Sequence, residues 1–237
     1  MLRIACDLDG TIADMDGALQ REAQRLFGPG VELRDAGQAL ERASAVEEAP
    51  PEGGEAVPKR GKGLTDRQMR QLWNHVNTIE NFWMTLSEIE PGSVARFAAL
   101  AAAHRWEVIF LTQRPPTAGE TAQRQSQRWL QAHGFELPSV YVMNGSRGKV
   151  AAGLRLHALV DDRAENCLDV IAESQAKPIL IWRGAPETVP PGAARLGLSP
   201  VFSFADALQR LEQMMATVAK SPSLLGRLRS AIGLPSD

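Results

Sequence analysis

The sequence predicts an α/β fold, a doubly wound parallel sheet with a small helical insert after its first strand. Short apolar runs of strand length alternate with stretches of helical periodicity, which favours a parallel sheet covered by helices. Polar residues directly follow several of these runs, at the strand ends where open α/β sheets bind their ligands. A helical stretch without strands separates the first apolar run from the second and predicts the insert.

The first strand and the motif after it organise the chain. Residues 2–6 form a short and mostly apolar run, as expected of a buried strand. Residues 7–11, directly after it, read DLDGT. Alternate residues of a strand point the same way, so Asp7 and Asp9 face one pocket if the extended geometry continues. Two carboxylates at this spacing repel each other, and a hard cation such as Mg²⁺ relieves the repulsion. Thr11 adds a hydroxyl after the turn.

The same motif is open to two other interpretations. Asp and Gly dominate ordinary turns, and Asp-x-Asp-Gly partly resembles an EF-hand calcium loop. The calcium loop needs Gly at its sixth position and Glu at its twelfth, where this chain has Ile12 and Ala18. The calcium loop is therefore excluded, whereas a turn and an active site both stay open on the motif alone.

Composition narrows the classes of function. At 237 residues the chain can form one large domain with an insertion. A net charge of −2 gives no electrostatic reason to expect a nucleic-acid polymer or a membrane as partner. Cys6 and Cys167 imply no disulfide framework, so a reduced, cytoplasmic setting is expected. The chain reaches Asp7 too soon for a signal peptide, and no apolar run approaches membrane-spanning length.

The expected insert covers residues 14–88 and forms a small helical cap. Apolar spacing predicts a helix over residues 13–27. Residues 31–63 lose this periodicity and are rich in Pro, Gly and Glu, which predicts a mobile segment. Helix resumes after Leu64, where Thr65 and Gln68 form a capping-box pattern.

The rest of the chain supplies the sheet and its helices. Further helices are expected over residues 93–103, 118–133, 163–174 and 205–218. Further strands are expected at 107–111, 140–143, 156–160 and 179–182, with an edge strand at 201–202. Residues 1–13 and 89–220 would then form the core domain. The amphipathic tail at 221–237 is expected to dock on that domain as a helix.

Polar side chains fall where four of the predicted strands end. In chain order they are Asp7 with Asp9, Thr112, Lys149 in a loop, and Asp161 with Asp162. A parallel sheet brings such ends to one edge. Carboxylates gathered there suit Mg²⁺, while a hydroxyl and an ammonium group suit phosphate oxygens. The pattern therefore indicates phosphoryl chemistry.

These residues resemble the four motifs of the haloacid dehalogenase (HAD) superfamily, in the right order over roughly residues 1–182. The resemblance implies a Rossmann-like core, Mg²⁺ and an aspartyl-phosphate intermediate. It implies that Asp7 is the nucleophile and that Asp9 is the general acid and base. Thr112 and Lys149 would steady the phosphoryl group. The side chains of Asp7 and Asp162, with the main-chain carbonyl of Asp9, would bind the metal.

Asp9 narrows the reaction within that superfamily, because its dehalogenases lack this acid and its transport ATPases carry Thr there. The resemblance thus favours phosphatases and phosphomutases, in which a leaving alkoxide needs a proton and water must later be activated. Asp161 and Thr11 are expected to support the metal ligands. Arg114 lies in the loop after the second strand, from where it is expected to reach the substrate phosphate.

The insert resembles the first type of small helical cap, and within that group the 5′(3′)-deoxyribonucleotidase branch. The residues that carry this finer resemblance are Asn-Phe-Trp at 81–83, Ile-Glu-Pro-Gly at 89–92, Phe-Leu-Thr at 110–112, Lys149 and Leu-Val-Asp-Asp at 159–162. Phe82 and Trp83 would form a flat wall for a nucleobase, or else would pack the cap helices together.

Two substrate classes therefore stay open, a nucleoside monophosphate and another small phosphorylated metabolite such as a sugar phosphate. A phosphomutase and a binding protein without catalysis are the further alternatives. Neither the oligomeric state nor the pathway follows from the sequence.

Overall fold

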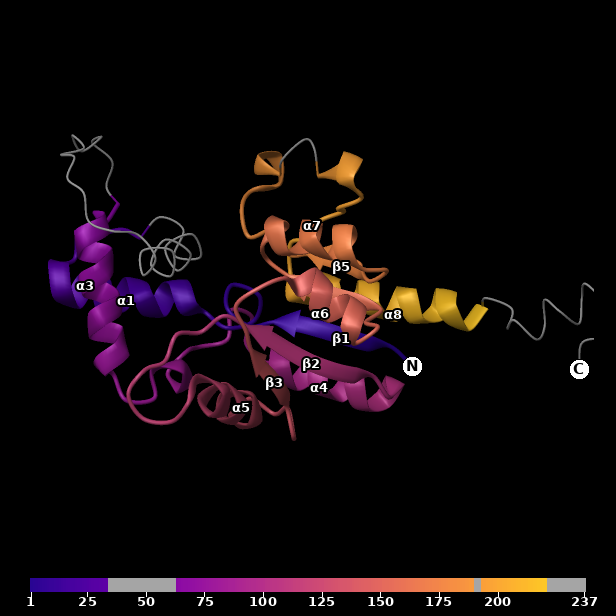
Figure 1. The fold of residues 1–237 in the computed structure, drawn as a ribbon, viewed down its shortest axis with the longest axis horizontal. Coiled ribbons are helices and arrows are strands. Elements are labelled where there is room, and N and C mark those ends of the chain that lie inside the picture. The colour runs from indigo at the N-terminus through magenta and orange to yellow at the C-terminus, as the bar shows by residue number, and fades with distance from the viewer. Residues whose placement is uncertain (34–62, 190–192, 221–237) are drawn as a thin grey trace, which may run out of the picture.

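The computed structural model describes residues 1–33, 63–189 and 193–220 (Figure 1). Within these residues five parallel strands form one sheet in the order β3-β2-β1-β4-β5. The strands are β1 (Arg3–Asp7), β2 (Glu107–Thr112), β3 (Ser139–Val142), β4 (Ala158–Asp161) and β5 (Lys177–Leu180). The strand order reverses between β1 and β4, which is where sheets of this kind bind ligands. The predicted α/β fold with a parallel sheet is confirmed.

Helices cover both faces of the sheet. They are α4 (Ser93–His104), α5 (Ala122–Ala132), α6 (Arg147–Gly153), α7 (Ala164–Glu173) and α8 (Phe204–Lys220). Ile4 and Cys6 of β1 pack in the cluster that includes apolar residues of α4, α5 and α8. Ala5, which points to the other face, packs with α6 and α7. Because both faces of β1 are buried, its three central residues, Ile4 to Cys6, are all apolar rather than alternating with polar ones.

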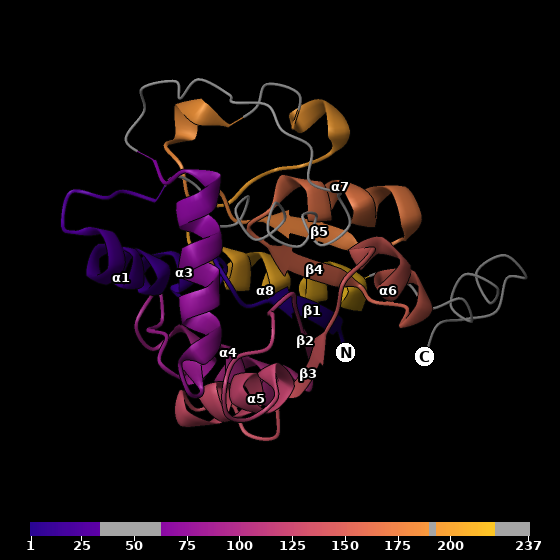
Figure 2. The ribbon, with the colours of Figure 1, turned by 60° about the vertical axis from the view of Figure 1, so that its left-hand side comes forward.

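Two helices of the insert lie side by side beyond one end of the sheet (Figures 1 and 2). They are α1 (Met15–Phe27) and α3 (Asp66–Thr78). Asp14 caps α1 by accepting a hydrogen bond from the Gly17 N–H. The predicted capping box at the start of α3 is confirmed, because the Thr65 side chain accepts from the Gln68 N–H and Gln68 accepts from the Thr65 N–H.

The insert leaves and rejoins the core through two paired segments next to the β1 motif. The Asp14 N–H donates to the Ser87 carbonyl at 2.9 Å, and the Ile89 N–H donates to the Ile12 carbonyl at 3.0 Å. Short 3₁₀ turns occur at η2 (Phe82–Met84), η3 (Pro186–Thr188) and η4 (Ala194–Leu196). Of these, η2 packs against α5 and, through Trp83, also lies near Trp73 of α3. The proposed domain limits, 14–88 for the cap and 1–13 with 89–220 for the core, stay a prediction.

The structure differs from the sequence-based expectation at α6, at the start of α5 and at residues 201–202, besides shifts of about two residues at the ends of β4 and β5. The segment that holds Lys149 was expected to be a loop and is the helix α6, whose seven residues include two glycines and are too few to show a helical period. The helix α5 begins at Ala122 because Thr121 caps it. In place of an edge strand at 201–202, a single parallel bridge joins Ile181 and Val201.

Two other expectations concern residues outside the described ones. The tail at 221–237 lies entirely outside them, and the segment 31–63 lies outside them from 34 to 62. None of the helices in the described parts is both long and apolar enough to cross a membrane.

Candidate active site

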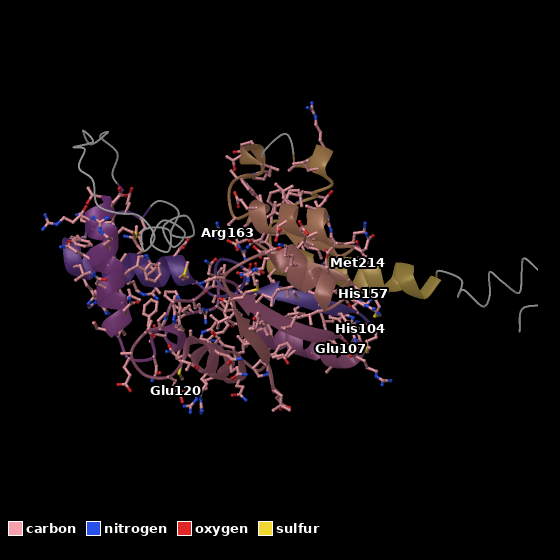
Figure 3. All side chains as sticks on the ribbon, viewed as in Figure 1. His104, Glu107, Glu120, His157, Arg163 and Met214 are labelled. Carbon is pink, nitrogen blue, oxygen red and sulfur yellow. The ribbon has the colours of Figure 1, made fainter. Side chains whose placement is uncertain are left out.

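A small cleft of about 60 Å³ lies where β1, β2 and β4 end. Its lining includes Asp7, Asp9, Thr112, Arg147, Asp162 and Arg163. Arg163 lies at the start of α7, toward α1 and α3 (Figure 3), and Met15 of α1 also lines the cleft. The parallel sheet therefore brings together most of the polar residues that the sequence singled out, at one edge and beside the insert.

Asp7 is the last residue of β1 and is 7% exposed. Its Oδ1 accepts a hydrogen bond from Nη2 of Arg147 at 3.2 Å. Burial raises the pKa of Asp7 well above its ordinary value, Asp161 raises it further, and Arg147 opposes both. Carboxylates crowded at the end of the sheet thus leave an excess of negative charge around Asp7.

Arg147 was not predicted, and it occupies the place expected for Lys149. It is the first residue of α6 and is 5% exposed, with Nε 3.9 Å from Oδ2 of Asp161. Lys149, two residues further along the helix, is exposed and does not line the cleft. Two steps along an α-helix turn the side chain by about 200°, so Arg147 and Lys149 point in nearly opposite directions.

The start of α6 is fixed by Asp169 of α7. Its carboxylate accepts hydrogen bonds from the Ser146 hydroxyl at 2.8 Å and from the Gly148 N–H at 2.7 Å. A Cβ on Gly148 would lie 2.2 Å from the Asp169 carbonyl oxygen, so only glycine permits this close packing. In the sequence, Ser146 is a residue type typical of a helix N-cap, but the contact of Arg147 with Asp7 depends on how α6 packs against α7 and has no local signal.

Asp161 and Asp162 follow one another at the end of β4 but face different partners. Asp161 is fully buried and accepts hydrogen bonds from Asn166 Nδ2 at 3.0 Å and from the Arg163 N–H at 2.9 Å. Asp162 lines the cleft and accepts a hydrogen bond from the Thr11 hydroxyl at 3.2 Å. Burial, reinforced by Asp161, raises the pKa of Asp162 to about 7. Asp161 is therefore held inward, whereas Asp162 is open to a ligand.

The residues at the cleft fit a hard cation such as Mg²⁺. No group of three His, Cys, Asp or Glu side chains in the described part of the chain is placed to hold a metal. A set of two carboxylates, Asp7 and Asp162, with the main-chain carbonyl of Asp9 needs no third side chain and offers oxygen ligands alone. A Cβ on Gly10, whose φ is +82°, would lie 2.2 Å from Oδ2 of Asp162, so glycine lets that carboxylate approach the β1 motif.

The side chain of Asp9 is turned to a different set of partners. Arg114 binds both of its oxygens, with Nε 2.8 Å from Oδ2 and Nη2 2.7 Å from Oδ1. The Thr112 hydroxyl, at the end of β2, donates to Oδ2 at 3.1 Å. Arg114 has no exposed side-chain surface and does not line the cleft. The guanidinium group of Arg114 is directed inward at Asp9 rather than into the cleft, and a contact with the substrate phosphate stays a prediction.

Phe82 and Trp83 also differ from the expectation that they form an open wall. Phe82 is 2% exposed and Trp83 is fully buried. The Trp83 indole N–H donates to the Pro115 carbonyl, and its main-chain N–H donates to Gln125 of α5. The two rings pack edge to face, and the Trp83 ring also lies 6.4 Å from that of Trp73 in α3 between centroids. Because both side chains are buried in this way, the second interpretation, internal packing, describes them.

Two other hollows lack the motif residues. One, of about 760 Å³, is lined in part by His157 and Met214, which lie at the end of the sheet opposite Arg163 (Figure 3). The other, of about 340 Å³, is lined in part by Glu22 and His75 of the insert helices. Neither contains a residue of the β1 motif, so the small cleft is the candidate active site.

Comparison with known proteins bears on the fold. No protein-family model matches the chain, and no curated protein matches it in sequence. Among solved structures, a HAD family hydrolase from Deinococcus radiodurans is 16% identical with a TM-score of 0.51, and the match covers 89% of this chain and 95% of that one. A haloacid dehalogenase-like family protein from Streptococcus pneumoniae is 12% identical with a TM-score of 0.50, over 89% and 98% of the two chains. The chain therefore has the fold of the HAD hydrolases.

Proposed function

We propose that this chain hydrolyses phosphomonoesters, with Asp7 as the nucleophile and Mg²⁺ as the cofactor. The observation that carries the proposal is the buried Asp7 carboxylate at the end of the central strand, 3.2 Å from the guanidinium group of Arg147. A nucleophilic carboxylate, a fixed cation beside it and a cleft lined by further carboxylates are the groups that phosphoryl transfer needs. The phosphate and sodium bound in the Deinococcus hydrolase support a phosphoryl site in this fold.

The proposed reaction has two displacements at phosphorus. An Asp7 oxygen forms a bond to phosphorus while the bond to the leaving oxygen breaks, and protonated Asp9 gives its proton to that oxygen. A water molecule then attacks the phosphorus of the aspartyl phosphate and loses a proton to Asp9, while the bond from phosphorus to Asp7 breaks. Inorganic phosphate and an alcohol are released, and both aspartates regain their initial states.

Other residues of the cleft would bind the metal, stabilise negative charge and orient the phosphoryl group. Bound Mg²⁺ would neutralise negative charge on the transferring group, and Asp7, Asp162 and the Asp9 carbonyl would hold it. We assign to Arg147 the charge-stabilising role expected for Lys149, because Arg147 contacts Asp7 and Lys149 is exposed. Thr112 is proposed to orient the phosphoryl group from the end of β2.

The proposed substrate is a small phosphorylated metabolite, such as a sugar phosphate. The small volume of the cleft, about 60 Å³, and the burial of Phe82 and Trp83 support a small substrate rather than a nucleotide. Nucleoside monophosphates, which the sequence resemblance favoured, are the alternative to be tested beside it.

The test is phosphate release by the purified chain with Mg²⁺ from a panel of sugar phosphates, other small alkyl phosphates and nucleoside monophosphates. We expect turnover of at least one small phosphate and none by a folded Asp7→Asn variant, with unchanged circular dichroism. Beryllium fluoride with Mg²⁺ should inhibit by occupying the phosphoryl site at Asp7. Substantial turnover by folded Asp7→Asn would contradict the covalent mechanism, and an isomeric phosphate as the main product would indicate a mutase.

A further inference from the structure

Arg114 is a buried arginine whose guanidinium group donates two hydrogen bonds to a single carboxylate. Its side chain has no exposed surface, and that of its partner Asp9 is 11% exposed. The two hydrogen bonds, 2.8 Å from Nε and 2.7 Å from Nη2, reach different oxygens of Asp9. Bidentate pairing of this kind fixes the plane of the carboxylate as well as its distance. Arg114 can therefore determine how Asp9 is oriented without touching a substrate.

Arg114 is itself held from two further sides. Its Nη1 donates to the Ser126 hydroxyl at 2.8 Å, and Ser126 in turn donates to the Ala122 carbonyl in α5. The Trp83 ring lies against the guanidinium group, with 4.9 Å from Cζ to the ring centroid, which is cation–π geometry. Trp83 is anchored by its hydrogen bonds to Pro115 and Gln125. This rigid surround leaves the guanidinium group little freedom to turn away.

The Asp9 carboxylate also accepts a hydrogen bond from the Thr112 hydroxyl, which donates to Oδ2 at 3.1 Å. We propose that Arg114 is a positioning residue that sets the orientation of the Asp9 carboxylate in the cleft. This inference rests on the proposed function, in which Asp9 gives a proton to the leaving oxygen and later takes one from water. When Asp9 has given its proton, the two N–H groups of Arg114 hydrogen-bond the resulting carboxylate and hold it in a fixed plane.

If Arg114 positions Asp9, its loss should affect substrates with different leaving groups differently, whereas loss of a residue that only supports the fold should affect them equally. An alkoxide leaves poorly unless it is protonated, whereas p-nitrophenolate leaves without a proton. The value of kcat/KM reports the steps up to departure of the leaving group, so loss of the acid lowers it far more for an alkyl phosphate than for p-nitrophenyl phosphate. If Arg114 acts through Asp9, variants of Arg114 should show the same dependence on the leaving group.

The experiment compares kcat/KM for p-nitrophenyl phosphate and for an alkyl phosphate taken from the substrate panel, in wild type, Asp9→Asn, Arg114→Met, Arg114→Lys and Asp9→Asn/Arg114→Met. Arg124→Met, which removes an arginine of α5 that is 62% exposed, is the matched control. We expect Asp9→Asn to lower the alkyl value by ~10²–10⁴-fold. Arg114→Met should lower it by ~10²-fold, as misplacement of a catalytic group by about 1 Å does. The aryl value should fall at least tenfold less.

Two comparisons make the inference falsifiable. The double variant should have the same kcat/KM for the alkyl phosphate as Asp9→Asn alone, because Arg114 acts through the carboxylate that Asp9→Asn has already removed. Arg114→Lys keeps the charge but cannot bind both oxygens of Asp9, so its kcat/KM for the alkyl phosphate should lie between those of wild type and Arg114→Met. It replaces Arg114→Met in the comparison if that variant does not fold. Equal losses on both substrates, or additive losses in the double variant, would overturn the positioning role. Absence of phosphate release by wild type would overturn the proposed function, and this role with it.

Discussion

Arg147 and Asp7 are 140 residues apart in the sequence, yet Nη2 of Arg147 lies 3.2 Å from Oδ1 of Asp7. The same guanidinium group also faces Asp161, with Nε 3.9 Å from Oδ2 of that residue. Among the described residues, this Nε has no hydrogen-bond partner. One cation is thus shared between two buried carboxylates and neutralises neither fully. The remaining negative charge is what a metal ion would compensate.

The first prediction separates Arg147 from Lys149. Arg147→Met should lower kcat by ~10²–10³-fold, the usual cost of removing one group that stabilises charge in the transition state. Lys149→Met, which removes an exposed cation from the same helix, should change kcat by less than about twofold, because exposed charges contribute little. Steady-state phosphate release, with melting temperatures to exclude unfolding, is the measurement. A larger loss in Lys149→Met than in Arg147→Met would restore the sequence-based assignment.

The second prediction concerns the metal. Mg²⁺ that binds only the folded chain should raise its stability by ~2.7 kcal/mol at a hundredfold excess over Kd. Asp162→Asn should abolish most of this shift, because it removes one of two carboxylate ligands. Asp206→Asn, which removes an exposed carboxylate in the first turn of α8, outside the cleft, should retain it. Differential scanning fluorimetry over a Mg²⁺ titration measures the effect. A wild-type melting temperature that is insensitive to Mg²⁺ and to EDTA would contradict the proposed site.

The third prediction is a pH dependence of stability without metal. The pKa of Asp162 is about 7 in the fold, against an ordinary value of 3.8. Between these values the unfolded chain loses the proton while the folded chain keeps it, so the free energy of unfolding falls as pH rises from about 4 to 7. Asp7, whose pKa is also raised, acts in the same direction. Melting temperatures in EDTA should therefore fall over this range.

Asp162→Asn is the control for that measurement. Its side chain does not titrate, so its melting temperature should fall less steeply with pH than that of wild type, and saturating Mg²⁺ should flatten the wild-type curve. Identical slopes for the two proteins in EDTA would show that folding does not raise the pKa of Asp162, which would contradict this prediction.

The sheet and the β1 motif could be predicted because their signals are local. A run of apolar residues marks each strand, and the polar residue at its end is brought to the site by the strand direction alone, as for Asp7 and Thr112. The capping box at Thr65 and Gln68 likewise depends only on neighbours in sequence. Such features do not require knowledge of what packs against them.

The differences between the expected and the observed site all involve the orientation of a side chain relative to a distant element. Arg147 and Lys149 lie on nearly opposite sides of α6, and the side that faces the cleft is set by the contact of this helix with Asp169 of α7. Arg114 was expected at the phosphate because a cation after the second strand suits an anion, but α5 and Trp83 enclose it beside Asp9. These partners come from tertiary packing, which residue types and spacing do not specify.

The last prediction concerns Trp83 and the choice of substrate. Trp83→Ala should lower stability by ~3–5 kcal/mol, because it removes a fully buried ring. It should also lower kcat/KM by the same factor for a nucleoside monophosphate and for a small alkyl phosphate. The leaving groups of this pair match, so any difference between them reports contact with the base rather than the action of Asp9. Met84→Ala, at a neighbouring side chain that is 37% exposed, is the control and should leave both values near wild type.

A loss at least fivefold greater for the nucleotide would contradict this prediction. Base stacking on an aromatic ring is worth ~1–3 kcal/mol, so a true wall would give a difference of that size. It would mean that Trp83 becomes exposed when a nucleotide binds, through a rearrangement of η2 away from α5. Equal losses on both substrates would instead identify Trp83 as packing that supports Arg114. In that case the choice of substrate must lie with residues that line the cleft, such as Met15 of α1.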